Sequence, residues 1–393
     1  MKKKTKISRL TPLILLLLGL VLVACESDEA VPAPAPPVKT AVEVTRIVTV
    51  DHPVEIEVTR LVTKTVYEEI IVEVTKMPIG SAERPLQILL PPMANTAVIQ
   101  TRSQPLLDYL TASTGRQYEI GIMDDEQSLI DLMCAAPVDT MGILSAEGVV
   151  RAAEQCGVQP GLVAIHPDGF TWEAGMIVVR RDASIGEFDQ LDGKSWAVPE
   201  TDPLLTRDYF EQQFAAAGIL PGEIITVSGD SAAMLAVFNG DVDFATGLFT
   251  PPIMPASEER LWEYGEDAAD TARWLGASPT RSPIGYVLLR GEPQYGGYRL
   301  RDARSRVFDI EPTIYDETRI ISLTAPIPNE TIVFGADFSL QAARDTLAAL
   351  DSFANSEACA DSICASDFYN WLGLEPITDA AFDPARGGAG SGD

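Results

Sequence analysis

The sequence contains only two histidines, His52 and His166, and few basic residues. Because histidine is so scarce, the sequence argues against a histidine-based catalytic triad and against a zinc site. The 29 Lys and Arg stand against 57 Asp and Glu, giving a formal net charge of -28. Such a charge argues against nucleic-acid binding, and no G-x-x-x-x-G-K-[ST] phosphate loop is present. We expect a protein without enzymatic activity, metal or cofactor.

Long apolar runs are also missing, except for one near the N-terminus. There, "PLILLLLGLVLVA" follows a basic segment and is 13 residues long, which suits a signal peptide better than a membrane span. The following "LVAC" resembles the lipobox of bacterial lipoproteins. That resemblance implies a signal peptide at 1–24 and acylation of Cys25, which would anchor the protein to the cell membrane outside the cytoplasm. The alternative is an ordinary signal peptide with an unrelated cysteine. Without the five basic residues of the signal, the mature chain would carry a charge of about -33.

Cysteine is scarce too, at five residues. With Cys25 assigned to lipid, four remain, and an even number in an oxidising compartment suggests two disulfides. Three pairings are open, and we choose the local one, which is Cys134–Cys156 with Cys359–Cys364.

The chain divides by composition. Residues 25–83 are expected to form a tether, rich in Pro and Ala, followed by a stalk with the repeats "VEVTR" at 42–46, "IEVTR" at 56–60 and "VEVTK" at 72–76. Their period-two pattern favours β structure, although a disordered repetitive linker explains them equally well. The tail 387–393 is expected to be disordered.

Between these ends, apolar strands alternate with amphipathic helices, as in "LQILLPP", "NTAVIQTRSQPLLDYLTASTG" and "QYEIGI". A second series of the same kind begins at "LDGKSWAVPE". This alternation predicts an α/β fold of two lobes, each a mainly parallel sheet flanked by helices, with ligands bound at the carboxyl ends of the strands. We place lobe I at 84–179 plus 334–386 and lobe II at 180–333.

Several motifs resemble one family. They are "LDGKSWAVPETDP", "AGILPGE", "VSGDSAAMLAVFNGDVDFA", "TAPIPNETIVF" and "WLGLEPITDAAFDPAR". Together they are similar to the phosphate/phosphite/phosphonate-binding proteins of ABC importers, which are type II periplasmic binding proteins. The resemblance covers about residues 84 to 386, except for a poorly fitting segment near 255–315. It implies a monomeric solute receptor, ABC permease subunits as partners, and a ligand cleft between the lobes.

The first candidate site is "PETDPLL". Members of this family usually carry a Ser/Thr cluster here, which holds phosphonate oxygens together with the helix start. In this chain Thr201 is flanked by Glu200 and Asp202. Asp202 precedes Pro203, so it also suits an N-cap role.

Further candidates follow other strands. Ser228, Gly229, Asp230 and Ser231 bring small and polar groups to a second helix start, either to contact ligand or to cap the helix. Ser145 and Glu147 stand at a third, where Glu147 is either a cleft acid or an ordinary first-turn acid. The remaining candidates are Met93, Asn95 and Thr96 after the first strand, Trp172 as a cleft aromatic, and His166 as a polar contact.

The acids decide our ligand prediction. Carboxylates beside the expected phosphonate position would repel a dianion. We therefore expect a cationic or zwitterionic small solute, held by Glu200 or Asp202 and a cation–π face of Trp172. Two alternatives stay open: phosphate or phosphonate binding as in the family, and a sensor module that reuses the fold.

Overall fold

The computed structural model describes residues 39–48, 56–65, 77–271, 276–290 and 297–389. The chain forms two compact units, Met1–Thr75 and Lys76–Asp393. The predicted signal peptide, Cys25 and the third stalk repeat at 72–76 lie outside the described residues, as does the end of the predicted tail, 390–393. Residues 387–389 of that tail were expected to be disordered, but they form the last residues of helix α9 (Asp383–Ala389). None of the helices within those ranges is long and apolar enough to cross a membrane.

The described residues of the first unit form an antiparallel ribbon of strands β1 (Lys39–Val48) and β2 (Ile56–Thr65). The register runs from Lys39 opposite Thr65 to Val48 opposite Ile56. The first two "EVTR" repeats lie in these strands, in keeping with the β interpretation of their alternation and not with the linker interpretation.

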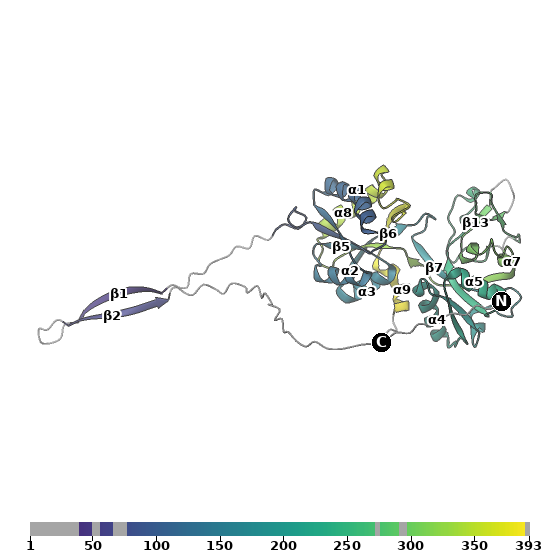
Figure 1. The fold of residues 1–393 in the computed structure, drawn as a ribbon, viewed down its shortest axis with the longest axis horizontal. Helices are drawn as coiled ribbons and strands as arrows, with labels where there is room; N and C mark the ends of the chain where they lie inside the picture. Colours follow the sequence, from purple (N-terminus) through teal and green to yellow (C-terminus); the bar gives the residue numbers. More distant parts are fainter. Residues whose placement is uncertain (1–38, 49–55, 66–76, 272–275, 291–296, 390–393) are drawn as a thin grey trace, which may run out of the picture. The chain divides into compact units, whose positions relative to one another are not determined.

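The second unit holds two large sheets, and each defines a lobe (Figure 1). The lobe I sheet has the order β17-β6-β16-β5-β3-β4. Its strands are β3 (Leu86–Leu90), β4 (Tyr118–Ile122), β5 (Thr140–Leu144), β6 (Gln159–Ile165), β16 (Thr331–Phe334) and β17 (Gly373–Pro376).

The lobe II sheet has the order β14-β7-β10-β8-β9, with β15 also paired to β7. Its strands are β7 (Trp172–Arg180), β8 (Trp196–Pro199), β9 (Ile224–Val227), β10 (Phe244–Phe249), β14 (Thr318–Leu323) and β15 (Ile327–Pro328). This is the predicted two-lobed α/β fold.

Both sheets are mixed, where mainly parallel sheets were predicted. Strands β3, β4 and β5 run parallel, as do β8, β9 and β10. The strands that arrive from the other lobe run the opposite way: β16 is antiparallel to β5 and β6, and β7 is antiparallel to β10 and β14. A strand that enters directly from the neighbouring lobe lacks the helical crossover that a parallel pairing requires.

These pairings also place the chain crossings. Strand β7 lies entirely in the lobe II sheet and β16 entirely in the lobe I sheet. The chain therefore passes between the sheets near 166–171 and near 329–330, whereas the expected division put the boundaries at 180 and 334. The division into lobes is refined to these segments.

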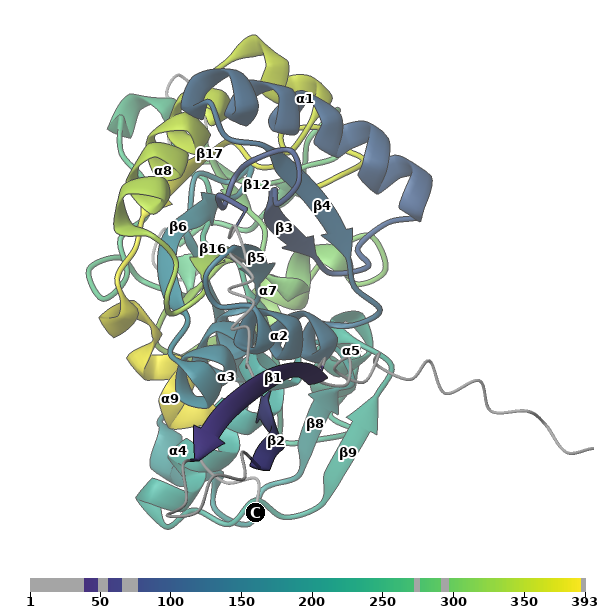
Figure 2. The same cartoon turned by 90° about the vertical axis from the view of Figure 1, so that its left-hand side faces the viewer.

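Helices cover both faces of the lobe I sheet (Figure 2). Helices α1 (Thr96–Thr114) and α8 (Leu340–Ala354) pack side by side on one face, where Ile99, Leu110 and Phe353 are buried. Helices α2 (Glu126–Ala135) and α3 (Ala146–Cys156) cover the other. The short C-terminal helix α9 (Asp383–Ala389) contacts both α3 and α4 (Tyr209–Ala217) of lobe II.

Both predicted disulfides are present. Cys134–Cys156 joins α2 to α3 with a Cα–Cα distance of 5.5 Å, and Cys359–Cys364 closes a short loop after α8. The first bridge ties two neighbouring helices of the same layer.

The segment near 255–315, which was expected to be an elaboration of lobe II, contains additional secondary structure. It contains a three-stranded sheet of β11 (Thr280–Arg281), β12 (Val287–Arg290) and β13 (Gly297–Leu300). The short helix α7 (Ile314–Glu317) follows, and α5 (Asp230–Asn239) completes the lobe.

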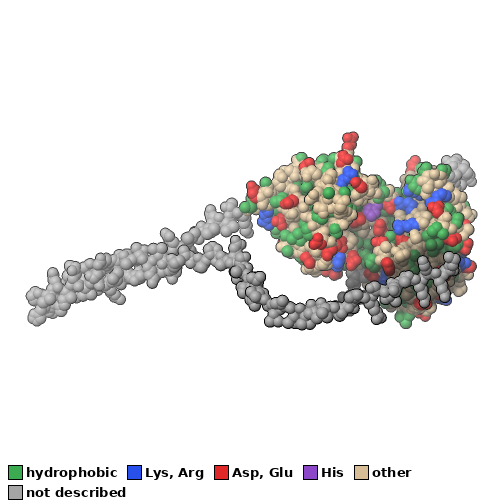
Figure 3. Space-filling view, viewed as in Figure 1, with side chains coloured by type: hydrophobic (Ala, Val, Ile, Leu, Met, Phe, Trp, Pro, Cys, Tyr) green, Lys and Arg blue, Asp and Glu red, His purple; other side chains and the backbone are tan. Residues whose placement is uncertain are grey.

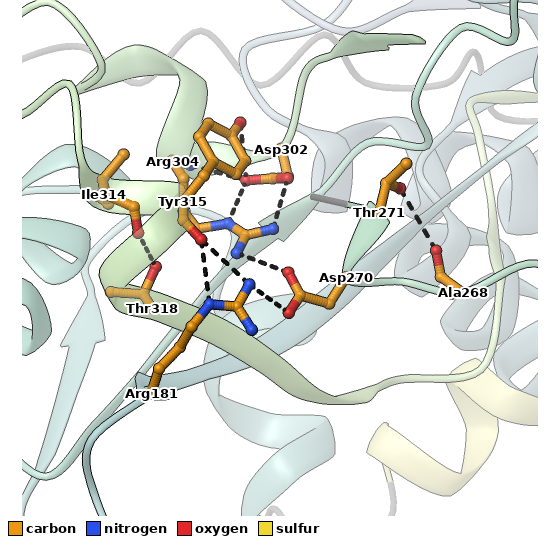
Figure 4. Close-up of polar contacts among 9 residues, drawn as sticks. All are labelled: Arg181, Ala268, Asp270, Thr271, Asp302, Arg304, Ile314, Tyr315 and Thr318. Atoms are coloured by element: carbon orange, nitrogen blue, oxygen red, sulfur yellow. Dashed lines mark hydrogen bonds and ion pairs between the residues drawn. The ribbon is translucent and has the colours of Figure 1, made fainter. Parts of the chain in front are cut away.

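A buried ionic network holds this elaboration to the end of β7 (Figure 4). Asp270 accepts from Arg181 at 2.6 Å and from Arg304 at 3.3 Å, and Arg304 also pairs with Asp302 at 3.0 Å. Arg304 is 1% exposed and lies 4.4 Å from the ring centre of Tyr315. Because each buried charge here has a partner of opposite sign, the network fixes the segment without an uncompensated charge.

Candidate functional site

A cavity of about 260 Å³ lies where residues of both sheets and both crossings meet. Lobe I contributes Ser145 and Glu147, and lobe II contributes Glu173, Asp202 and Leu204. The crossings contribute His166, Asn329 and Glu330. Its volume suits a small solute. We call it the cleft.

Strand ends place the polar groups of the cleft. Ser145 directly follows β5, and His166 directly follows β6. Glu173 is the second residue of β7, and Glu330 immediately precedes β16. The crossings thus bring two carboxylates and the imidazole together between the sheets.

The crossings are also hydrogen-bonded to each other. Asn329 is 4% exposed, and its side-chain amide donates to the carbonyls of Ala164 at 3.0 Å and Phe170 at 2.9 Å. The backbone amide of Asn329 donates to Thr171 at 2.9 Å. This residue therefore fixes the two crossings against each other beside the cleft.

His166 carries a positive charge between two acids. Its Nε2 lies 2.7 Å from Oε2 of Glu330, and its Nδ1 lies 3.6 Å from Oε1 of Glu173. Burial by itself lowers the pKa of His166, but Glu173 and Glu330 outweigh it and raise that pKa to about 10. The same contact with His166 outweighs burial at Glu330, whose pKa is lowered. The ion pair is thus formed at neutral pH.

Acids outnumber this one cation. Glu147, Glu173, Asp202 and Glu330 line the cleft with His166. Burial raises the pKa of Asp202, and the charges of Glu173 and Asp230 raise it further, while Arg306 opposes them. Asp202 therefore sits in a negative field, as expected where several carboxylates share a poorly solvated space.

The start of α3 is already occupied by a carboxylate of the chain. The backbone amide of Ser145 donates to Oε1 of Glu126 at 2.7 Å, and the Ser145 hydroxyl donates to Oε2 at 3.1 Å. Arg151 holds the same carboxylate at 2.7 Å. A Cβ at Gly148 would lie 2.5 Å from Glu126, so this glycine makes room for the acid. Glu126 takes the place that an anionic ligand would use at this helix start.

The start of α4 is unusual. Asp202 has the left-handed φ of 48°, and a π-turn at Leu204–Asp208 precedes α4. Non-glycine residues in the left-handed region and π-turns are both frequent at functional sites. The carbonyl of Asp202, not its side chain, accepts the first amides of the turn, from Leu205 at 3.1 Å and Thr206 at 3.0 Å. No side chain of the described residues caps this turn, so the carboxylate of Asp202 does not fill the predicted N-cap role.

The start of α5 holds a third acid. Asp230 is 4% exposed, and its Oδ2 lies 3.6 Å from Arg306. Burial raises the pKa of Asp230. The charge of Arg306 and a hydrogen bond from the Leu248 amide lower this pKa, but burial has the larger effect. Gly229 is the N-cap, and within the described chain neither Ser228 nor Asp230 caps the helix with its side chain.

The structure brings together four of the predicted residues: Ser145, Glu147, His166 and Asp202 line the cleft. Asp230 does not line the cleft, but its charge raises the pKa of Asp202. Glu147 also lies 3.9 Å from Arg151 one turn on, so both interpretations of Glu147 hold together.

The other predicted residues lie outside the cleft lining. Asn95 caps α1 by accepting from the Val98 amide at 3.0 Å. Trp172 packs among Phe170, Trp262 and Tyr264, and borders a different hollow. The cleft lining also lacks seven further predicted site residues: Met93, Thr96, Glu200, Thr201, Ser228, Gly229 and Ser231.

Glu173, Asn329 and Glu330 are absent from the prediction, although they form the polar centre of the cleft with His166. Glu173 adjoins Trp172, and Glu330 lies in "TAPIPNETIVF". The signal in the sequence was the presence of polar residues at or just before the starts of β7 and β16. No three His, Cys, Asp or Glu side chains of the described ranges gather as a metal site would need.

No protein of curated function matches the chain. A Xanthomonas citri protein solved with bound chloride shares 16% identity over 77% of this chain and 96% of its own, with a TM-score of 0.46. A binding protein component of a Pseudomonas aeruginosa ABC phosphonate transporter shares 13% identity over 77% of this chain and 84% of its own, with a TM-score of 0.39. Prochlorococcus marinus PhnD1, solved with methylphosphonate, shares 9% identity over 77% of this chain and 95% of its own, with a TM-score of 0.39.

The family model described as "ABC transporter, phosphonate, periplasmic substrate-binding protein" matches residues 88–382. That match covers both lobes, both crossings and every residue of the cleft. The chain therefore belongs to the family of periplasmic substrate-binding proteins of phosphonate ABC transporters.

Proposed function

We propose that this protein is the lipid-anchored solute receptor of an ABC importer and that its cleft selects a small cationic or zwitterionic solute. The observation that carries the proposal is the cleft lining, in which four carboxylates accompany one histidine. Members of the family are transporter components and not enzymes.

Electrostatic arithmetic supports the sign of the ligand. A carboxylate about 4 Å from a phosphonate costs on the order of 4 kcal/mol at an effective dielectric near 20, and it favours a cation by the same amount. Each of these amounts alone corresponds to roughly a thousandfold in affinity. His166 is already neutralised by Glu330 at 2.7 Å, so it has little charge left to offer an anion.

The helix starts support the same conclusion. Backbone amides at helix starts are the usual anchors of an anion. Glu126 accepts from the amide and hydroxyl of Ser145 at α3, and Asp230 is buried at the first position of α5. Glu126 therefore leaves less donor capacity at α3 for the oxygens of a phosphonate, and the buried Asp230 adds negative charge at the start of α5.

We assign the partners of the cation to Asp202 and Glu173. Both line the cleft, and the charge of Glu173 raises the pKa of Asp202, which indicates that they share one space. Glu200 and Trp172, which were expected to share this role, lie outside the lining. The apolar wall of Leu204, Leu205 and Ile327 would contact the rest of the solute.

The alternative is phosphate or phosphonate, favoured by membership of the family itself. In that case Ser145 would have to exchange Glu126 for the ligand, and Asp202 would have to turn away or bind a proton. Isothermal calorimetry against phosphate, phosphite, simple phosphonates and a panel of amines separates the two.

The variants Glu173→Gln and Asp202→Asn sharpen that experiment, with Asp189→Asn as control, since Asp189 is an exposed acid that does not line the cleft. We expect wild type to bind an amine, and each cleft variant to bind it roughly 10- to 100-fold more weakly. The control should match wild type. Micromolar phosphonate binding that both cleft variants leave unchanged would end the proposal.

A further inference from the structure

A second pocket, of about 240 Å³, lies on the small sheet of lobe II and shares no lining residue with the cleft. Val287 and Leu300 pair across β12 and β13 and are buried, so the neighbouring pair of Leu288 and Arg299 faces the other side of the sheet. The polar lining of the pocket consists of Arg281, Tyr286, Arg299, Arg301 and Ser305. Figure 3 shows Lys and Arg side chains gathered on this lobe around β13.

Arg299 is the lining residue on which the argument for this pocket rests. Its guanidinium lies 3.2 Å from the ring centre of Tyr286, and no carboxylate of the described residues pairs with it. Stacking uses the face of the guanidinium and leaves its N–H edge available. That edge can donate two parallel hydrogen bonds to one anion.

The other two arginines are already held in place. Arg301 donates to Asp168 at 2.6 Å and to the Pro251 carbonyl at 3.1 Å through Nη2 and Nε. Arg281 pairs with Asp309 at 2.5 Å and donates to the Gly285 carbonyl at 2.7 Å. Their side chains therefore need little ordering when a ligand arrives.

The pocket keeps a positive charge after these pairs are counted. Among the residues that the structure describes, three guanidinium groups stand against the carboxylates of Asp168 and Asp309, which leaves one net positive charge. Burial lowers the pKa of Arg301 and the nearby charge of Arg299 adds to this, although Asp168 opposes both. This occurs in a chain with a formal charge of -28.

We propose that this pocket binds a phosphate group with a single negative charge, either as dihydrogen phosphate or as a phosphodiester. One net positive charge matches one negative charge, and the forked edge of Arg299 matches two phosphate oxygens. The hydroxyls of Tyr286 and Ser305 are further donors at the same pocket. This site is independent of the solute cleft.

The test uses the Cys25→Ser chain, so that no lipid anchor contributes, and measures binding of dimethyl phosphate, inorganic phosphate and acetate by calorimetry. We expect both phosphates to bind, and Arg299→Gln to weaken them by about tenfold or more. Arg299→Lys, which keeps the charge but loses the fork, should recover only part of the affinity. Arg207→Gln removes a cation that pairs with Glu211 on the surface of α4 and should change nothing.

A cleft variant keeps this result separate from the proposed function. Glu173→Gln should bind phosphate as wild type does, and Arg299→Gln should bind the amine of the cleft as wild type does, which also shows that it is folded. Vesicles of phosphatidylglycerol, compared with phosphatidylcholine alone, identify the source: Arg299-dependent binding indicates a headgroup, and binding of the free anions alone indicates a free phosphate. Unchanged phosphate affinity in Arg299→Gln, acetate bound as tightly as dimethyl phosphate, or no anion bound at all would overturn the proposal.

Discussion

Because of His166, we expect the free energy of unfolding to fall as the pH becomes alkaline. The perturbation is the loss of its proton, which removes the ion pair with Glu330 at 2.7 Å and the charge facing Glu173 at 3.6 Å. Its folded-state pKa is about 10, against an ordinary value of 6.5. A group whose pKa is raised by folding stabilises fully below its unfolded value, and this contribution is lost as pH rises through the folded value. Stability from His166 is thus complete below about pH 6.5 and gone above about pH 10.

The magnitude follows from the shift. A rise of about 3.5 units corresponds to roughly 5 kcal/mol, at about 1.36 kcal/mol per unit. The His166 side chain is 22% exposed and both glutamates are more exposed, so solvent screening reduces the effect. We expect about 2 kcal/mol between pH 7 and pH 10.

Urea denaturation of wild type and His166→Gln at several pH values measures this difference. Other titrating groups cancel between the two proteins, so the gap between their unfolding free energies should shrink as pH rises. The chain has only two histidines, so proton NMR can follow the imidazole directly once the variant assigns it. An imidazole that titrates near pH 6.5, or a gap that stays constant from pH 7 to pH 10.5, would refute the reasoning.

Further predictions concern anchoring, covalent links, packing and motion. Cys25→Ser should release the protein from membranes, and unchanged membrane fractionation would refute the anchor. Replacing Cys134 and Cys156 by Ser should cost about 3 kcal/mol in urea denaturation, because the bridge closes a loop of 22 residues; an unchanged midpoint would contradict this. A Cβ at Gly175 would lie 1.9 Å from a carbonyl oxygen of the π-turn, so Gly175→Ala should lower the melting temperature and solute affinity. Gly186→Ala is the control, since its nearest neighbour would be at 3.6 Å; equal effects of the two would count against the packing argument. Solution scattering should show compaction with saturating amine, and an unchanged radius of gyration would argue against closure about the crossings.

Much of the fold follows from local pattern. The alternation of buried strands and amphipathic helices predicts most of both sheets, and helix ends such as Gly115 and Gly157 adopt the left-handed conformation that terminates helices. The direction of the returning strands β7 and β16 does not follow, because an apolar run reads the same in a parallel or an antiparallel neighbour. For this reason the sequence did not predict that both sheets are mixed or that the crossings come earlier than residues 180 and 334.

Only part of the candidate site could be predicted from the sequence. Residues at strand ends, such as Ser145 and Asp202, could be placed because carboxyl ends of parallel strands share one edge. Glu173 and Glu330 could not, since their meeting at His166 depends on two crossings that are far apart in sequence. The role of Glu126 is hidden for a similar reason, because its carboxylate reaches from α2 to the start of the next helix.

The central claim is that the cleft selects positive charge. Calorimetry of the native protein with methylphosphonate and with tetramethylammonium, at one ionic strength and neutral pH, compares two small ligands of opposite charge in the same cavity. The four carboxylates and the neutralised His166 predict tighter binding of the cation, by roughly a hundredfold or more. Tighter binding of methylphosphonate would contradict the account.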